Sequence, residues 1–174
     1  RLQRWRKGYF NADKPESPTA FVPNDDETAL LPFVAKMNDG LLEFSEEPKE
    51  VQILDENGNL LLAGDNDRRF FEAAWLHKYN GKYYFSYSTG DTHLICYGIG
   101  DNPYGPFQYK GRILNPVVGW TSHHSICEID GKSYLFYHDS SLSKGVTHLR
   151  CVKVKEIKYR SDGSIITLNP YKDY

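Results

Sequence analysis

Two stretches of apolar and aromatic residues, about fifty residues apart, dominate the pattern of the chain. Each consists of an apolar run, an Asn-Gly or Asp-Gly pair and an aromatic run; the first spans Trp75 to Ser88 and the second Ser125 to His138. Because Asn-Gly and Asp-Gly tolerate the positive φ angles of a two-residue turn, each stretch predicts a β-hairpin. A repeat of roughly forty to fifty residues built from strands is typical of propeller blades.

The pattern predicts one complete blade and a second that repeats its plan. The first blade, residues 70–118, contains four expected strands, at 71–78, 82–88, 94–99 and 107–114. The second, residues 119–170, contains expected strands at 124–129, 133–138, 148–154 and 156–168, the last of them broken by an Asp-Gly turn. Gly and Pro residues between the last two strands of the first blade predict a tight connection.

The chain before residue 70 has a thinner pattern. Short apolar runs at 33–37, 41–44 and 51–54 predict the outer half of a blade within residues 33–69. Residues 1–32 are rich in Pro, Asp and Asn and predict a loop or arm. The expected fold class is therefore all-β, a partial β-propeller of about two and a half blades over residues 1–174. Because propellers close with typically four to eight blades, the chain is either a piece of a longer protein or self-associates.

Composition fits a β-rich chain and excludes several classes of function. The 174 residues include 13 Tyr, 9 Phe and 3 Trp but a single Met, which suits pleated sheets that pack through rings. A net charge of −2 leaves no basic stripe for nucleic acid, and no apolar run approaches the ~20 residues of a membrane span. Motifs for nucleotide phosphates, for paired-cysteine zinc sites and for serine hydrolases are absent from the sequence.

The three cysteines constrain the compartment weakly. Cys96, Cys127 and Cys151 are odd in number and each falls in an apolar strand pattern, which favours buried free thiols over disulfide or metal roles. Free thiols slightly favour a cytoplasmic over a secreted location. The chain starts at Arg1 without Met, so localisation is otherwise unknown.

A single acidic residue is the first candidate for chemistry. Glu72 stands among aromatic and apolar neighbours at the start of an innermost strand. Burial there would disfavour the anion and raise the pKa of the carboxyl, as a general acid at neutral pH requires. The alternative is a strand-end Glu that pairs with Arg68 or Arg69, and by pattern alone this structural role is favoured.

Two further candidates lie in the second blade. His123 and His124 are adjacent, so on a strand they point to opposite faces and only one can look down the propeller axis. A structural histidine is the more common interpretation of such a residue. Arg150 interrupts an apolar strand pattern and offers a fixed fork of donors to a hydroxylated ligand, with a salt bridge as an equal alternative.

The motifs together resemble glycoside hydrolase family 43. They are the segment from Phe71 to Asp91, the run Asn102-Pro-Tyr-Gly-Pro-Phe107, and the run Trp120-Thr-Ser-His-His-Ser125 followed by Tyr134-Leu-Phe-Tyr-His138. Their order and spacing are most similar to the β-xylosidase and α-L-arabinofuranosidase members. The resemblance covers roughly residues 1–170 and corresponds to the C-terminal portion of that family, without its first blades.

The resemblance implies a five-bladed propeller that hydrolyses glycosidic bonds with inversion. By motif position Glu72 matches the general acid, and His123 matches a histidine that helps hold a calcium or similar divalent ion at the propeller axis. Arg150 matches an arginine that contacts the sugar. Trp75 and Trp120 are candidate apolar walls for a sugar ring. These assignments reverse the structural interpretations of Glu72 and His123 that pattern alone favours.

One part of the family machinery has no counterpart in this sequence. The catalytic base and the Asp that tunes the acid belong to segments that would precede Arg1, and neither Asp13, Asp25 nor Asp26 has the matching context. Inversion requires two carboxyl groups ~6.5–9.5 Å apart, of which the chain supplies one.

The expected function is hydrolysis of xylosidic or arabinofuranosidic bonds in plant polysaccharides or oligosaccharides. The partner is thus a xylose- or arabinose-containing saccharide, with neither nucleic acid nor membrane. Self-association, or a second chain that supplies the missing blades, is a further alternative, since two copies add up to about five blades. The competing function is a truncated, catalytically silent carbohydrate-binding or assembly module.

Overall fold

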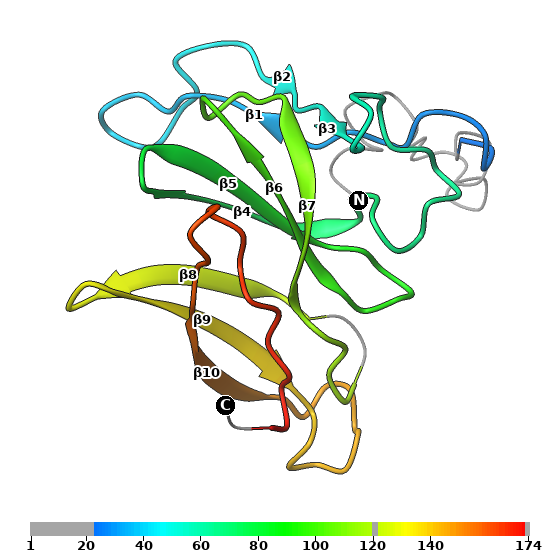
Figure 1. The fold of residues 1–174 in the computed structure, drawn as a ribbon, viewed down its shortest axis with the longest axis vertical. Helices are drawn as coiled ribbons and strands as arrows, with labels where there is room; N and C mark the ends of the chain where they lie inside the picture. The colour runs from blue at the N-terminus through cyan, green and yellow to red at the C-terminus, as the bar shows by residue number, and fades with distance from the viewer. Residues whose placement is uncertain (1–22, 120–121, 173–174) are drawn as a thin grey trace.

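The protein is all-β, and its strands gather in three sheets (Figure 1). The structure is a computed structural model and describes residues 23–119 and 122–172. The largest sheet has the strand order β3-β7-β6-β5-β4, the second has the order β10-β9-β8, and β1 and β2 form a small third sheet. The strands are β1 Phe33–Val34, β2 Lys49–Glu50, β3 Ile53–Leu54, β4 Glu72–Tyr79, β5 Lys82–Ser88, β6 Ile95–Gly100, β7 Phe107–Leu114, β8 His124–Ile129, β9 Lys132–Asp139 and β10 Cys151–Ile157.

Both predicted hairpins are confirmed. β4 and β5 pair in antiparallel fashion around Asn80 and Gly81, whose φ angles are 45° and 78°. β8 and β9 pair around Asp130 and Gly131, with φ angles of 51° and 73°. Two successive residues with positive φ give the turn whose twist matches that of the flanking strands, which is why Asn-Gly and Asp-Gly stand there.

The segment before the first complete blade does not form half a blade of its own. Only β3 joins a large sheet, where Ile53 pairs in parallel with Phe107 and Leu54 with Gln108, so that β3 becomes a fifth strand beside β7. The strand expected at 41–44 is absent, because Leu41 has a φ of 56° and the chain forms a turn there. A single isolated bridge joins Met37 and Phe44.

The second blade has three strands where four were expected. β10 ends at Ile157, and the chain then turns at Asp162 and Gly163, with an isolated bridge between Tyr159 and Ile165. Beyond the turn, Leu168 pairs in parallel with Leu114 of β7, and its N–H donates to the carbonyl of Ile113 at 2.7 Å. The predicted strand 156–168 is therefore wrong, because the Asp-Gly turn sends the chain back to the first blade.

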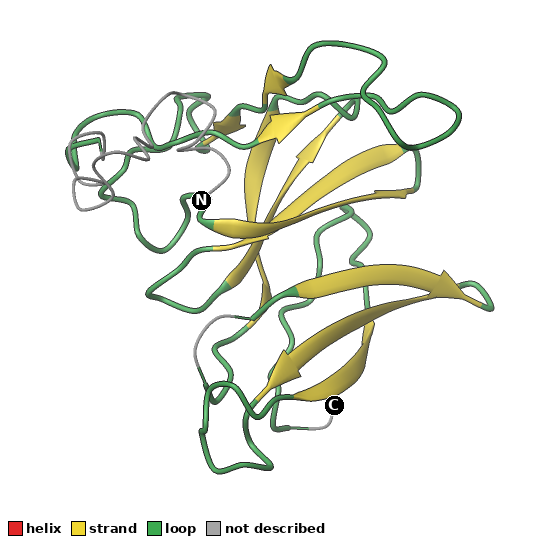
Figure 2. Cartoon of the chain, turned by 180° about the vertical axis from the view of Figure 1, so that it is seen from behind, coloured by secondary structure: helices red, strands yellow, loops and turns green. Residues whose placement is uncertain are grey.

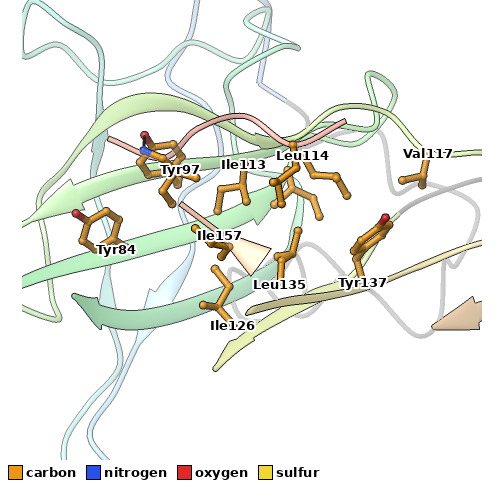
Figure 3. Packing of buried hydrophobic residues seen from close by; sticks show 12 residues of the cluster. Tyr84, Tyr97, Ile113, Leu114, Val117, Ile126, Leu135, Tyr137 and Ile157 are labelled. Carbon is orange, nitrogen blue, oxygen red and sulfur yellow. Dashed lines mark hydrogen bonds between the residues drawn. The ribbon is translucent and has the colours of Figure 1, made fainter. Parts of the chain in front are cut away.

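Two cores lie on the two faces of the five-stranded sheet. One fills the space between this sheet and the three-stranded sheet, and the side chains of both sheets interlock in it (Figure 3). The other lies on the opposite face, under the segment that contains β3. Fully buried rings such as Tyr84, Tyr87 and Phe107 dominate both cores, as the abundance of aromatics predicted. The first core fixes the position of one blade against the other.

The outer face of the three-stranded sheet is open. Val152 and Val154 of β10 are 76% and 53% exposed, and Ile129 of β8 is 48% exposed. Seen from behind, this sheet closes one end of the molecule (Figure 2). Because exposed apolar residues gathered on one surface are typical of interaction sites, this face is a candidate interface.

The cysteines differ in their exposure to solvent. All three cysteines are free; Cys96 is buried and Cys151 half-buried, but Cys127 is exposed, so the expectation of three buried thiols is wrong for Cys127. It lies on the open face of β8, where no described element covers it. Within residues 23–119 and 122–172, no helix has the length and apolar character needed to cross a bilayer.

Candidate active site

The local backbone around Glu72 is irregular. Glu72 opens β4 and pairs with Ser88 of β5, and a β-bulge separates this pair from the next one, between Trp75 and Ser86. Within the bulge, Ala73 has a φ of 60°, which is uncommon for a residue with a side chain. Bulges redirect the side chains beside them and are frequent near active sites. The bulge thus sets the direction of the Glu72 carboxyl independently of the regular part of β4.

The side chain that lies beside the Glu72 carboxyl is a histidine from the second blade. His123 Nε2 lies 3.4 Å from Glu72 Oε1, and the two side chains are 54% and 35% exposed. The alternative partners are engaged elsewhere: Arg68 pairs with Asp65 and Glu56, and Arg69 donates to Asn66. The structural pairing of Glu72 with Arg68 or Arg69 is therefore wrong. Glu72 is half-buried rather than enclosed.

Two further side chains extend this pair into a row. The backbone N–H of His123 donates to His138 Nε2 at 3.2 Å, and the two imidazole rings are stacked with centroids 6.1 Å apart. Arg150 Nη1 lies 3.4 Å from the same nitrogen of His138, and Arg150 Nε donates to the carbonyl of Thr147 at 2.8 Å. The polar row thus runs from Glu72 through His123 and His138 to Arg150.

The electrostatics of the row favour a neutral His138. Burial lowers its pKa from the ordinary value, and the positive charge of Arg150 and the nearby His123 lower it further. Since Nε2 accepts hydrogen bonds from two donors, the ring proton is on Nδ1. Neutral His138 is therefore a hydrogen-bond acceptor that fixes the His123 backbone and steadies the Arg150 guanidinium.

The structure places the adjacent histidine on the other side of the strand. His124 lies between the two sheets, where its Nε2 is 2.7 Å from Ser86 Oγ. Burial lowers its pKa to about 3, and the nearby His123 and His77 add to the effect. The two rings thus have different environments, His123 beside Glu72 and His124 beside Ser86. His124 has a structural role, as a neutral ring within the core.

The predicted site residues are partly brought together. Glu72, His123 and Arg150 share the polar row, whereas Trp75 is half-buried and packs against the core between the sheets. Trp120 lies outside the described residues. His138 is the member of the row that sequence reasoning missed. One signal could have found it. His138 lies near the end of the strand that pairs with the His-His segment, and because it follows buried Tyr137, strand alternation places it on the opposite face.

The described residues do not by themselves form a calcium site. Calcium takes six to eight oxygen ligands, and a histidine supplies only a nitrogen. Within residues 23–119 and 122–172, no group of three or more His, Cys, Asp or Glu side chains converges as a metal site would require. His123 fits a contact to calcium through water. The oxygen ligands of the ion would have to come from outside the described residues.

Comparison with known proteins gives a consistent result. A xylosidase/arabinosidase of Bacteroides ovatus is 59% identical over 167 residues, which are 96% of this chain and 50% of that protein. Xylosidase/arabinosidase 43A of Humicola insolens is 57% identical over 170 residues, 97% of this chain and 52% of that protein. No protein-family model matches the chain.

The fold has a solved counterpart. A family 43 β-xylosidase/α-arabinofuranosidase from a compost microbial metagenome, in complex with xylotriose and in a calcium-free form, superposes with a TM-score of 0.91 and 59% identity. It covers 99% of this chain, which in turn covers 52% of it.

By sequence and by structure the chain is thus similar to known glycosidases of all-β architecture. The chain belongs to glycoside hydrolase family 43, among proteins named xylosidase/arabinosidase. It spans about half the length of the curated relatives it matches.

Proposed function

We propose that the chain carries the acid half of an inverting glycosidase that cleaves xylosidic or arabinofuranosidic bonds of plant saccharides. The observation that carries the proposal is the placement of Glu72 in a bulge beside His123, at the junction of two blades. In the reaction Glu72 donates its proton to the glycosidic oxygen as the bond to the sugar breaks. In the same step a water attacks the anomeric carbon from the opposite face of the ring and gives a proton to the second carboxylate.

The other members of the polar row have binding roles in this proposal. Arg150 presents a guanidinium steadied by Thr147 and His138, and so offers planar donors to sugar hydroxyls. His123 holds Glu72 in place and faces the axis, where it is our expected contact for a calcium or similar ion through water. Trp75 and Trp120 stay predicted walls for a sugar ring.

The second carboxylate is expected from outside the described residues. The proposed reaction needs a base ~6.5–9.5 Å from the acid, and a positioned base contributes typically 10²–10⁴-fold to the rate. Two sources fit the proposal: the further half of a family 43 protein, or another chain seated on the open face of β8–β10. Five blades in the assembled ring are part of the same proposal.

The test is release of nitrophenol from aryl β-xylopyranoside and aryl α-arabinofuranoside by the 174-residue chain. It is run beside Glu72→Gln, which keeps the shape but cannot donate a proton, and beside Glu128→Gln, which alters an exposed carboxyl on β8. Turnover lost in the first variant and kept in the second supports Glu72 as the acid. Turnover unaffected by Glu72→Gln would overturn the proposal.

A silent binding or assembly module is the second candidate, favoured by the half-length match to the relatives. It predicts no turnover in any of the three proteins but retained binding of xylotriose, measured by calorimetry. Supply of the missing half in trans separates the two functions, because a latent glycosidase then becomes active and Glu72→Gln blocks that gain.

A further inference from the structure

The packing between the two blades contains a cluster of polar atoms without protein partners. We define the seam as the facing sides of β4, β5 and β8. Six buried side-chain nitrogen or oxygen atoms of the described residues lack a hydrogen-bond partner, and four of them belong to the seam. The four are Trp75 Nε1, His77 Nδ1, Ser88 Oγ and His124 Nδ1.

The four residues are neighbours in the fold. Trp75 pairs with Ser86, the hydroxyl of which is 2.7 Å from His124 Nε2. His77 lies two positions further along the same face of β4, and its proximity contributes to the lowered pKa of His124. Ser88 lies two positions beyond Ser86 on β5, on the same face of the sheet. The four residues therefore lie along the same seam.

The hydrogen bonds of the two histidine rings leave one nitrogen of each without a protein partner. His77 bonds to Tyr159 through Nε2 and His124 to Ser86 through Nε2, so each has one ring nitrogen engaged. Whichever tautomer is present, the remaining Nδ1 is a free donor or a free acceptor. Trp75 Nε1 is a donor only, and the Ser88 hydroxyl can do both.

Leaving such atoms bare is unfavourable. A buried polar group without a partner costs about 1–3 kcal/mol, and natural proteins satisfy nearly all such groups with protein or ordered water. A buried water typically makes about three hydrogen bonds to polar groups that the protein leaves unpaired. A cluster with both donors and acceptors along one seam is the setting in which internal water is found.

We propose that the seam is an internal water-binding site, formed by Trp75, His77, Ser88 and His124, that joins the two blades through bridging hydrogen bonds. One end of the seam lies beside Glu72, the proposed acid, because Ser88 is the cross-strand partner of Glu72. The bound ligand is water.

The first test uses the sign of a stability change. If the Ser88 hydroxyl is unpartnered, Ser88→Ala removes a bare polar group and raises the melting temperature. If the hydroxyl binds internal water, the same change strands that water and lowers the melting temperature by roughly 2–4 °C. Ser86→Ala, which breaks a direct bond to His124, is the positive control, and exposed Ser161→Ala is the neutral one.

The second test observes the water. Nuclear Overhauser transfer from long-lived water to the indole N–H of Trp75 and to the ring proton of His124 is expected in the native protein. A crystal structure should show density bonded to Trp75 Nε1 and Ser88 Oγ. A rise in melting temperature for Ser88→Ala, or direct pairing of the four atoms with one another in the crystal, overturns the proposal. Neither outcome depends on glycosidase activity, so the proposed function is tested separately.

Discussion

His123 Nε2 and Glu72 Oε1 are 3.4 Å apart, although the two residues belong to different blades. The contact joins the start of β4 to the residue that precedes β8, and it links the expected acid to the second blade. Because both side chains are half-exposed, the link orients Glu72 more than it stabilises the fold.

The first prediction concerns His123→Asn. The change should alter the free energy of unfolding by less than about 1 kcal/mol, since exposed ion pairs contribute little. In the assembled enzyme it should reduce aryl-glycoside turnover by about tenfold or more, because the acid loses its orienting partner. Urea unfolding and initial rates measure the two effects. His148→Asn, at an exposed loop position, is the matched control and should leave both unchanged.

The second prediction concerns the bulge. Ala73→Gly should stabilise the protein by about 0.5–1 kcal/mol, because a Cβ at a φ of 60° is strained and Gly is not. Ala74→Gly, one residue on with an ordinary φ, should instead destabilise the strand by about the same amount. Thermal unfolding of the two variants decides the point: equal losses of stability in both would mean that the bulge strain is absent.

The third prediction is a dependence of stability on pH. Burial lowers the pKa of His77 to about 4 and that of His124 to about 3, against an ordinary value of 6.5. The unfolded chain therefore binds protons that the folded chain does not. Stability should be complete above pH 6.5 and should fall by up to about 1.4 kcal/mol per pH unit for each histidine as the pH decreases toward 4.

Urea midpoints measured from about pH 7 to about pH 5 check this window, which precedes the protonation of ordinary carboxylates near pH 4. His77→Phe removes one titrating group and should flatten the profile. An unchanged slope in that variant would show that His77 is already protonated in the folded protein.

The fourth prediction concerns the open face. If another sheet covers β8–β10, the chain alone should self-associate through that face, and a double change of Val152 and Val154 to Thr should lower its sedimentation mass toward that of a monomer. Leu42→Ser, which alters a residue 88% exposed on a different segment, is the control. A wild-type chain that sediments as a monomer at all concentrations contradicts the prediction.

The sequence predicted those parts of the fold that have local causes. Asn80-Gly81 and Asp130-Gly131 specify their turns by backbone conformation, so the two hairpins followed from four residues. The end of the second blade was mispredicted because the apolar residues near Leu168 satisfy a pairing with Leu114, more than fifty residues away. Strand alternation carries no information about which distant strand a residue meets.

The site divides in the same way. Charge in an apolar pattern marked Glu72 and Arg150 as candidates, and only the family resemblance gave them their predicted roles. The sequence did not predict that Glu72, His123 and Arg150 form one row with His138. That arrangement depends on how the two sheets pack, which the pattern along the chain does not encode. The bulge at Ala73 was equally hidden, since Ala-Ala carries none of the Gly that often marks such a kink.

The parallel pairing of β3 with β7 changes what counts as a transferable unit of this protein. A transfer of residues 70–118 alone would leave β3 behind. The transferred segment would then expose the unpaired edge of β7 in the recipient protein. A segment that keeps this sheet complete therefore begins before β3 and ends after β7. The boundary of the sheet in space thus differs from the boundary of the repeat in the sequence.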